Sequence, residues 1–182
     1  ASIEAFFMAR RLAWDAGTVS PATLRIHFIG TDYVPGERAT SRVIDLARAI
    51  GVENFVDERP QRLPYLRTLR ALSDADALLM FGSDEAGYTA SKLLPYILAR
   101  KPLLTVFHEH SSITSMMREM NAGVAISFSS GLDREALAAT ILSQWFINGT
   151  FDCTPDTRWD LFHQYGAEAM TERITAIFDR VA

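Results

Sequence analysis

Short apolar segments alternate along the chain with longer segments in which apolar residues recur every three or four positions. The short segments, such as ADALLMF at 75–81 and PLLTVF at 102–107, have strand length, and their near-continuous apolarity is typical of strands covered on both faces. The longer segments, such as RATSRVIDLARAIG at 38–51, have the period of a helix that buries one side. The pattern predicts strands at 24–30, 52–58, 75–81, 102–107 and 124–128, helices at 3–14, 38–51, 63–75, 89–101, 111–123 and 134–148, and one long or broken C-terminal helix over 156–182.

Residues that favour helix ends stand where this pattern needs them. Gly51 closes the second predicted helix, since glycine readily adopts the left-handed conformation with which many helices end. Pro64 stands near the start of the third, where a missing N–H costs little. The helix at 111–123 begins with a capping serine and ends at Gly123.

The alternation of strands and helices predicts an α/β fold, a Rossmann-like doubly wound parallel sheet with helices on both faces, because parallel strands need crossover helices. The 182 residues suit one domain over 1–182. A Rossmann-like unit opens with a strand and a glycine-rich phosphate loop, whereas this chain opens in a helix. We expect that strand and loop either to have been removed or to belong to sequence outside this chain, which would then be part of a longer two-domain protein.

Composition excludes several classes of protein. The formal net charge is −4, from 18 Lys and Arg against 22 Asp and Glu, whereas general nucleic-acid binders usually have a basic excess. No apolar run approaches the roughly 20 residues that cross a bilayer, and no charged-then-apolar leader opens the chain. Cys153 is the single cysteine, interpreted as a loop thiol, and no Cys and His pattern has zinc spacing. We therefore expect a cytoplasmic protein without a transmembrane segment, with peripheral membrane association of a full-length protein left open.

Polar loops follow four of the predicted strands: GTDYVPGER, GSDEAGYTASK, HEHSS and SFSSG. Because ligands of open parallel sheets bind beyond the carboxyl ends of the strands, these loops are predicted to share one edge. Thr89 or Ser91 would cap the helix at 89–101, and Ser111 with Ser112 would begin the next. Two helix N-termini and the cation of Lys92 at this edge favour an anionic ligand. A capped helix with one exposed lysine is the simpler interpretation of either start alone.

The stretch SDADALLMFGSDEAGYTASKLLPYILARKPLL at 73–104 resembles the nucleotide-binding C-terminal domain of GT-B type retaining glycosyltransferases, specifically the large family that includes sucrose and mannosyl transferases. LRIHFIG at 24–30 and NAGVAISF at 121–128 are similar to other strands of that domain. The segment at 159–181 resembles its terminal helix, which in this architecture often crosses back to the N-terminal domain.

This resemblance implies a sugar transferase of the hexosyltransferase type that uses a nucleotide-diphosphate sugar as donor and needs no metal or other cofactor. It also implies an N-terminal Rossmann-like domain in the same full-length chain, which holds the acceptor, so the isolated domain would be inactive. The positions that match donor-binding residues are Gly30, Thr31, Glu85, Tyr88, Thr89, Ser91, Lys92, Glu109, Ser111 and Ser112.

The chain departs from the family at two positions. Many members carry two glutamates eight positions apart, and here Gly87 and Pro95 occupy those positions, with Glu85 the nearest carboxylate to the first. Catalytic residues are therefore left unassigned. Two alternatives stay open: a non-catalytic binding or interaction module on the same scaffold, and another enzyme of this architecture such as a nucleotide-sugar epimerase, for which the sequence HEH at 108–110 is the candidate group.

Other notable residues have ordinary structural interpretations. His27 is predicted to be a strand-face histidine, and His108 and His110 to be solvated loop residues. Arg10 and Arg11 are predicted to lie away from the apolar side of the first helix. Three methionines of one helix are predicted to fill the core, namely Met116, Met117 and Met120.

Overall fold

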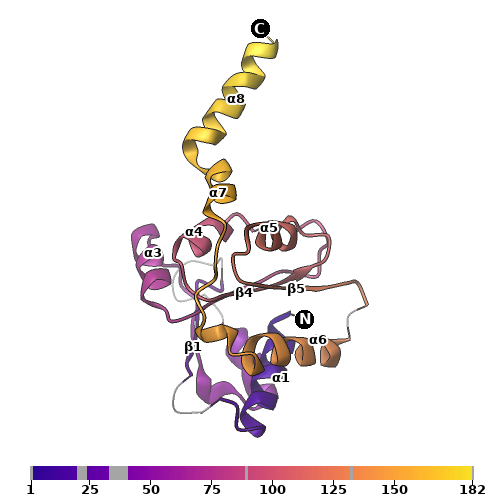
Figure 1. The fold of residues 1–182 in the computed structure, drawn as a ribbon. Helices are drawn as coiled ribbons and strands as arrows, with labels where there is room; N and C mark the ends of the chain where they lie inside the picture. The colour runs from indigo at the N-terminus through magenta and orange to yellow at the C-terminus, as the bar shows by residue number, and fades with distance from the viewer. Residues whose placement is uncertain (1, 20–23, 33–40, 89, 132, 182) are drawn as a thin grey trace.

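The computed structural model describes residues 2–19, 24–32, 41–88, 90–131 and 133–181 (Figure 1). The strands in these ranges are β1 (Ile26–Ile29), β2 (Val56–Arg59), β3 (Leu78–Phe81), β4 (Leu103–His108) and β5 (Val124–Phe128). They form two parallel sheets, of order β1-β2 and β3-β4-β5. The predicted α/β fold with parallel strands is confirmed, although its strands pair in two groups.

Helices cover both faces of these strands. The described α-helices are α1 (Ser2–Asp15), α2 (Val43–Ile50), α3 (Tyr65–Asp74), α4 (Leu93–Leu98), α5 (Ser112–Met120), α6 (Arg134–Ile141), α7 (Trp159–Phe162) and α8 (Ala167–Val181). There are also the 3-10 helices η2 (Glu53–Phe55), η4 (Thr150–Asp152) and η5 (His163–Tyr165), and the π-helix η3 (Leu142–Ile147), which continues α6. Figure 1 shows α4 and α5 on one side of β4 and β5, and α1 and α6 on the other. This is the doubly wound arrangement that the alternating pattern predicts.

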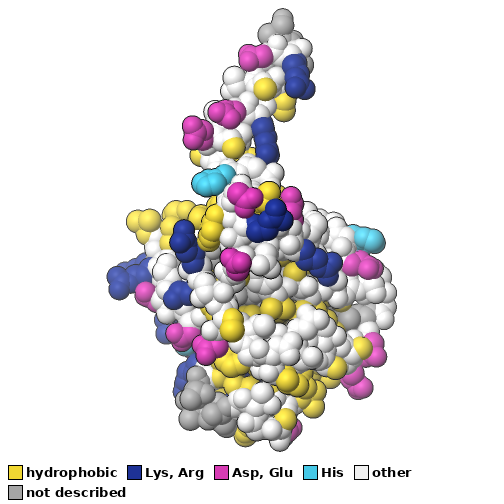
Figure 2. Space-filling view, viewed as in Figure 1, with side chains coloured by type: hydrophobic (Ala, Val, Ile, Leu, Met, Phe, Trp, Pro, Cys, Tyr) yellow, Lys and Arg dark blue, Asp and Glu magenta, His cyan; other side chains and the backbone are white. Residues whose placement is uncertain are grey.

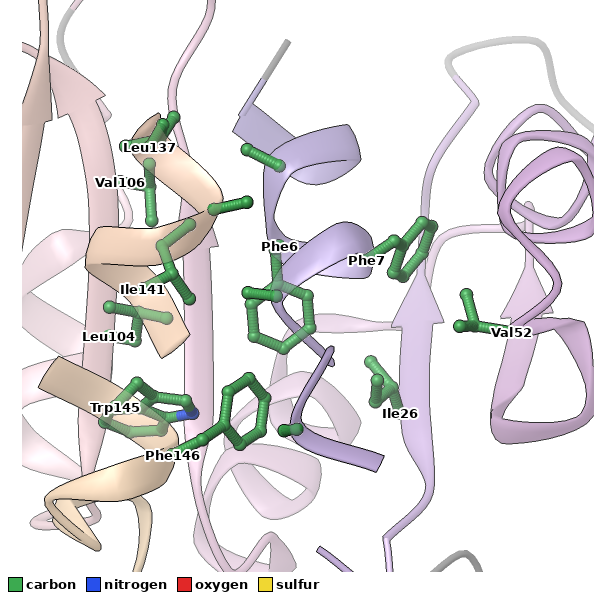
Figure 3. Packing of buried hydrophobic residues seen from close by; sticks show 14 of the residues in the cluster. Phe6, Phe7, Ile26, Val52, Leu104, Val106, Leu137, Ile141, Trp145 and Phe146 are labelled. Carbon is green, nitrogen blue, oxygen red and sulfur yellow. The ribbon is translucent and has the colours of Figure 1, made fainter. Parts of the chain in front are cut away.

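The larger core lies between α1, α6 and the strands. Phe6 and Phe7 of α1 are fully buried there, and Figure 3 shows them between Leu104 of β4 on one side and Ile26 of β1 on the other. Trp145 of η3 closes the same core. Burial of one such aromatic side chain contributes about 1.5–3 kcal/mol, so α1 holds the two sheets together.

The second core lies on the other face. Leu103 and Phe107 of β4 point into it, whereas Leu104 and Val106 point into the first, because successive side chains of a strand alternate between faces. Met117 and Met120 are fully buried in this core and Met116 packs at its edge, so the prediction that they fill the core is confirmed.

Helix ends differ from the prediction in three places. The helix predicted at 89–101 is only the six residues of α4, and the one predicted at 38–51 begins at Val43, with Gly51 capping it at φ 77° as expected. The helix predicted to end at Gly123 ends at Asn121, which takes the left-handed conformation itself at φ 48°. Gly123 has a different role, because a Cβ there would lie 2.3 Å from the carbonyl O of Leu103.

Arg10 contradicts the prediction that it lies away from the apolar side of its helix. Its side chain is fully buried, with the guanidinium 3.8 Å above the centroid of the Phe55 ring. Arg11 does lie outside, in an ion pair with Asp15 at 3.0 Å. Arg10 follows Phe6 by one helical turn, so the helical spacing that buries Phe6 also buries Arg10.

Tyr96 of α4 gives the second core a predictable response to alkali. Burial raises the pKa of its phenol, because the phenolate would lose its water. A phenol whose pKa is higher in the folded state contributes stability that is fully present below the unfolded pKa, about 10, and is lost as pH rises above it. The free energy of unfolding from urea melts should therefore fall between pH 9 and 11 more steeply than in Tyr96→Phe. Tyr65→Phe, at an exposed ring, is the matched control, and equal slopes in all three proteins would contradict the prediction.

The C-terminal segment is a broken helix, which is one of the two forms predicted for it, a long helix or a broken one. α7 and η5 pack on the second core, and α8 begins after Gly166 and stands clear of the body (Figure 1). The described side chains of α8 beyond Ala169 are all exposed. Its apolar side chains Met170, Ile174, Ile177 and Phe178 lie at helical spacing and are exposed on the helix that projects from the body (Figure 2). Arg173 of this helix donates to Oε1 of Gln164 in η5 at 3.4 Å.

Candidate functional site

The carboxyl ends of the described strands of both sheets lie at one edge of the molecule. The first residue of α1, Ser2, donates from Oγ to the carbonyl O of Gly82, just beyond β3, at 2.8 Å. In the last turn of α1, the Trp14 ring contacts the Phe55 ring just before β2, at 5.3 Å between centroids. α1 therefore runs antiparallel to strands of both sheets, so these strands point the same way. We call the residues that follow them, 30–32, 82–88, 109–112 and 129–131, the rim.

Within the rim, the loops after β3 and β4 are in direct contact. Ser111 donates from Oγ to the carbonyl O of Tyr88 at 2.8 Å, and Ser111 is 3% exposed. The Tyr88 ring stacks on the Phe107 ring, with centroids 6.2 Å apart and 12° between the planes. Gly82 is needed beneath this stack, because a Cβ there would lie 2.5 Å from the Phe107 ring. Tyr88 and Ser111, predicted to share one edge, thus lie together.

The N-terminus of α5 opens at this contact. Ser111 is its N-cap and accepts a hydrogen bond from the backbone N–H of Ile113 at 3.3 Å, as predicted. The same hydroxyl thus fixes both the helix start and the Tyr88 loop. Ser112, the first residue of the helix, is exposed beside it. The positive end of a helix dipole therefore faces the rim at Ser112.

The start of α4 does not provide the second helix N-terminus that the sequence predicts. α4 begins at Leu93, and its N-cap position is Lys92, where no side chain caps the helix. Ser91 is exposed and does not cap it, and Thr89 lies outside the described residues. Pro95 is the third residue of α4, where its missing N–H breaks no helical bond. Lys92 is exposed, four residues beyond Tyr88 of the rim.

His108 is buried, contrary to the prediction of a solvated loop residue. It is the last residue of β4 and is 2% exposed. Its Nδ1 accepts the backbone N–H of His110 at 3.2 Å, so Nε2 carries the proton and donates to Oγ of Ser130 at 3.2 Å. His108 thus ties the loop after β4 to the loop after β5. Glu109 and His110 are exposed, and no cluster of metal-ligating side chains occurs among the described residues.

Glu58 of β2 organises the rim after β1, and it was not among the predicted site residues. Oε1 of Glu58 accepts the Thr31 hydroxyl at 2.6 Å, and Oε2 accepts the backbone N–H of Ile44 at 2.8 Å. A carboxylate of the protein therefore already occupies the N-terminus of α2. The sequence gives only a weak signal for this role. Glu58 is one acidic residue near the end of a strand, and the N–H that it accepts belongs to Ile44, 14 residues earlier in the chain.

The structure brings some of the predicted site residues together and separates others. Tyr88 and Ser111 are joined by a hydrogen bond. The backbone carbonyl of Glu85 accepts the N–H of Tyr88 at 3.1 Å, and the backbone N–H of Glu109 donates to the carbonyl O of Phe128 at 2.8 Å. Gly30, at φ 72°, and Thr31 instead follow β1 of the two-stranded sheet, where the Thr31 hydroxyl donates to Glu58. The candidate site is thus the half of the rim that runs from Gly82 through Tyr88 to Ser112.

Comparisons of the chain with protein-family models, with curated proteins and with solved structures find no match. Among the described helices, none combines the length and apolarity needed to cross a membrane.

Proposed function

We propose that this chain is the donor-binding half of a glycosyltransferase, which transfers a sugar from a nucleotide-diphosphate donor to an acceptor held by a second, N-terminal Rossmann-like domain. The donor diphosphate would lie at the rim, between the Tyr88 loop and the N-terminus of α5. The rim holds and orients the donor, and backbone N–H groups with Lys92 offset the negative charge that develops on the leaving diphosphate. The chain alone would bind donor without turning it over.

The observation that carries this proposal is the hydrogen bond from Ser111 Oγ to the Tyr88 carbonyl. It holds the two loops together beside the N-terminus of the nine-residue helix α5, and a helix N-terminus is a favourable place for an anion. Lys92 is exposed in the same loop region and has the reach to contact a phosphate. The resemblance of residues 73–104 to the donor domain of the transferase family points the same way.

A non-catalytic nucleotide-sugar binding module is the second candidate. Gly87 and Pro95 stand where the family carries glutamates, and α4 lacks the capped N-terminus that would strengthen an anion site. Such a module would bind the donor by the same rim, so binding alone does not separate the two. Sugar transfer by the chain together with its acceptor domain would support the transferase, and donor binding without transfer would support the module.

Donor binding is tested by NMR titration of the chain with UDP-, GDP- and ADP-sugars. We expect shifts to concentrate at residues 82–92 and 109–113 for at least one base. Lys92→Met should weaken that binding about tenfold, since a charge-assisted contact to phosphate contributes about 1.5–3 kcal/mol, less at an exposed site.

Lys101→Met is the matched control, because Lys101 precedes β4 at the opposite edge of the sheet. It should leave donor affinity unchanged within about twofold, because Lys101 and a donor at the rim are farther apart than the Debye length, so salt screens their interaction. Titration of the unsubstituted chain to millimolar donor without shifts near Lys92 would reject the proposed function.

A further inference from the structure

The side of β1 that faces away from β2 carries backbone groups that no described strand bonds. In a parallel sheet a residue directs its N–H and its C=O to the same neighbouring strand, and successive residues alternate between the two neighbours. The N–H of Gly30 donates to Arg59 at the end of β2, so Ile26 and Phe28 also face β2. His27 and Ile29 therefore direct their backbone groups to the other side.

β3 has an open side of the same kind. The N–H of Leu78 donates to Pro102 and that of Gly82 donates to Val106, so the even-numbered residues face β4. Leu79 and Phe81 direct their backbone groups away from β4. The described sheets end at these two sides, because β1 pairs only with β2 and β3 pairs only with β4.

The two open sides face each other. The Phe28 ring of β1 stacks on the Phe81 ring of β3, with centroids 6.3 Å apart and 22° between the planes. α1 lies over this junction, because the Phe7 and Phe28 ring centroids are 5.8 Å apart and the Phe6 and Phe81 ring centroids are 5.3 Å apart. The strands thus follow the order β2, β1, slot, β3, β4, β5, where the slot is the unpaired junction between His27 and Ile29 on one side and Leu79 and Phe81 on the other.

We propose that the slot takes one further strand: an extended apolar segment of at least four residues that runs parallel to β1 and β3 and leads into Ser2 through a short loop. Such a strand would bond His27 and Ile29 on one side and Leu79 and Phe81 on the other, and would join the two sheets into one. An unpaired sheet edge is a template for a further strand, because its N–H and C=O groups have no strand to bond. This inference does not rest on the proposed function.

The connection to Ser2 follows from the path of the neighbouring unit. From β1 the chain passes through α2 to β2, and α2 packs on the same core as α1. A strand in the slot would connect through α1 to β1. This connection would cross the same face of the sheet and move in the same direction, away from β3, as the connection from β1 through α2 to β2. The two crossovers would therefore have the same handedness. Ser2 bonds to Gly82 at the rim, where a strand in the slot would end.

The surroundings define the side chains of this strand. On the α1 side it would meet the rings of Phe28 and Phe81, whose contact leaves room between them only for a small residue such as Gly, Ala or Val. On the other side it would cover Ile29, an apolar strand residue that is now 40% exposed. A strand buried on both faces is apolar throughout. The strand that fits the slot therefore alternates small residues on the α1 side with larger β-branched residues on the other side.

The test compares amide hydrogen exchange in the 182-residue chain and in a chain extended ahead of Ala1 by Val-Ala-Val-Ala-Val and a four-residue Gly-Ser loop. In the unextended chain, the amides of Ile29 and Phe81 should exchange at least tenfold faster than those of Phe28 and Met80, their paired neighbours. In the extended chain, Ile29 and Phe81 should slow by at least tenfold.

An extension of equal length with proline at alternate positions of the strand is the control, since proline removes the N–H groups that the pairing needs. Equal slowing by both extensions, or no slowing by either, would overturn the proposal. The unextended chain gives an independent reading if the apolar extension prevents folding. If the amides of Ile29 and Phe81 in the unextended chain are as protected as those of Phe28 and Met80, the edges of the slot are already paired. That result would also overturn the proposal.

Discussion

Gly123→Ala should lower the free energy of unfolding by about 3–5 kcal/mol, enough to leave the chain marginally folded at best. Gly123 precedes β5 at φ 134°, a backbone conformation that L side chains rarely adopt. A Cβ there would lie 2.3 Å from the carbonyl O of Leu103 and 3.1 Å from its Cβ. The obstacle is the backbone of the central strand β4, which cannot swing aside as a flexible side chain would. Urea melts followed by circular dichroism measure the loss.

Gly17→Ala is the matched control for this prediction. Gly17 also has a positive φ, of 70°, but a Cβ there would meet nothing within 4 Å. It should therefore cost only the conformational term, about 1 kcal/mol. A Gly123→Ala chain that melts at the same urea concentration as Gly17→Ala would show that the close approach to β4 is absent in solution.

β4 was predictable because burial on both faces leaves a local sequence signal, whereas the strand predicted at 52–58 begins only at Val56, after the 3-10 helix η2. The continuous apolar runs predicted β5 to the residue and β4 within one residue at each end. Helix starts were less predictable, because they depend on capping partners that lie elsewhere in the chain. α2 begins where Glu58 of β2 accepts its first N–H groups, and α4 begins at Leu93, after the loop fixed by Ser111.

The candidate site was predictable at the level of loops and not of atoms. The alternating topology places the loops after β3 and β4 at one edge, and Tyr88 and Ser111 do meet there. The bond between them spans 23 residues and joins a side chain to a backbone carbonyl, for which no local pattern exists. His108 shows the same limit, since a polar HEH sequence gives no sign that its first member ends a buried strand.

Arg10→Met should raise the free energy of unfolding by about 2 kcal/mol, an unusual direction for a change at a fully buried position. None of the three guanidinium nitrogens of Arg10 has a hydrogen-bond partner in the described structure, and burial lowers the pKa of this side chain because its charged form loses water. Stacking on Phe55 at 3.8 Å offsets only part of this cost, since a desolvated cation–π contact contributes about 2 kcal/mol. Methionine has a similar length, carries no charge and fills the same space between Trp14 and Phe55.

Arg11→Met separates this effect from a general benefit of methionine in α1. Arg11 is the next residue, its side chain is 43% exposed, and its ion pair with Asp15 is an exposed i,i+4 pair, so its loss should change stability by less than about 0.5 kcal/mol. Thermal and urea melts of the two single variants and the unsubstituted chain measure both values. A destabilised Arg10→Met chain would mean that the guanidinium finds an anionic partner in solution.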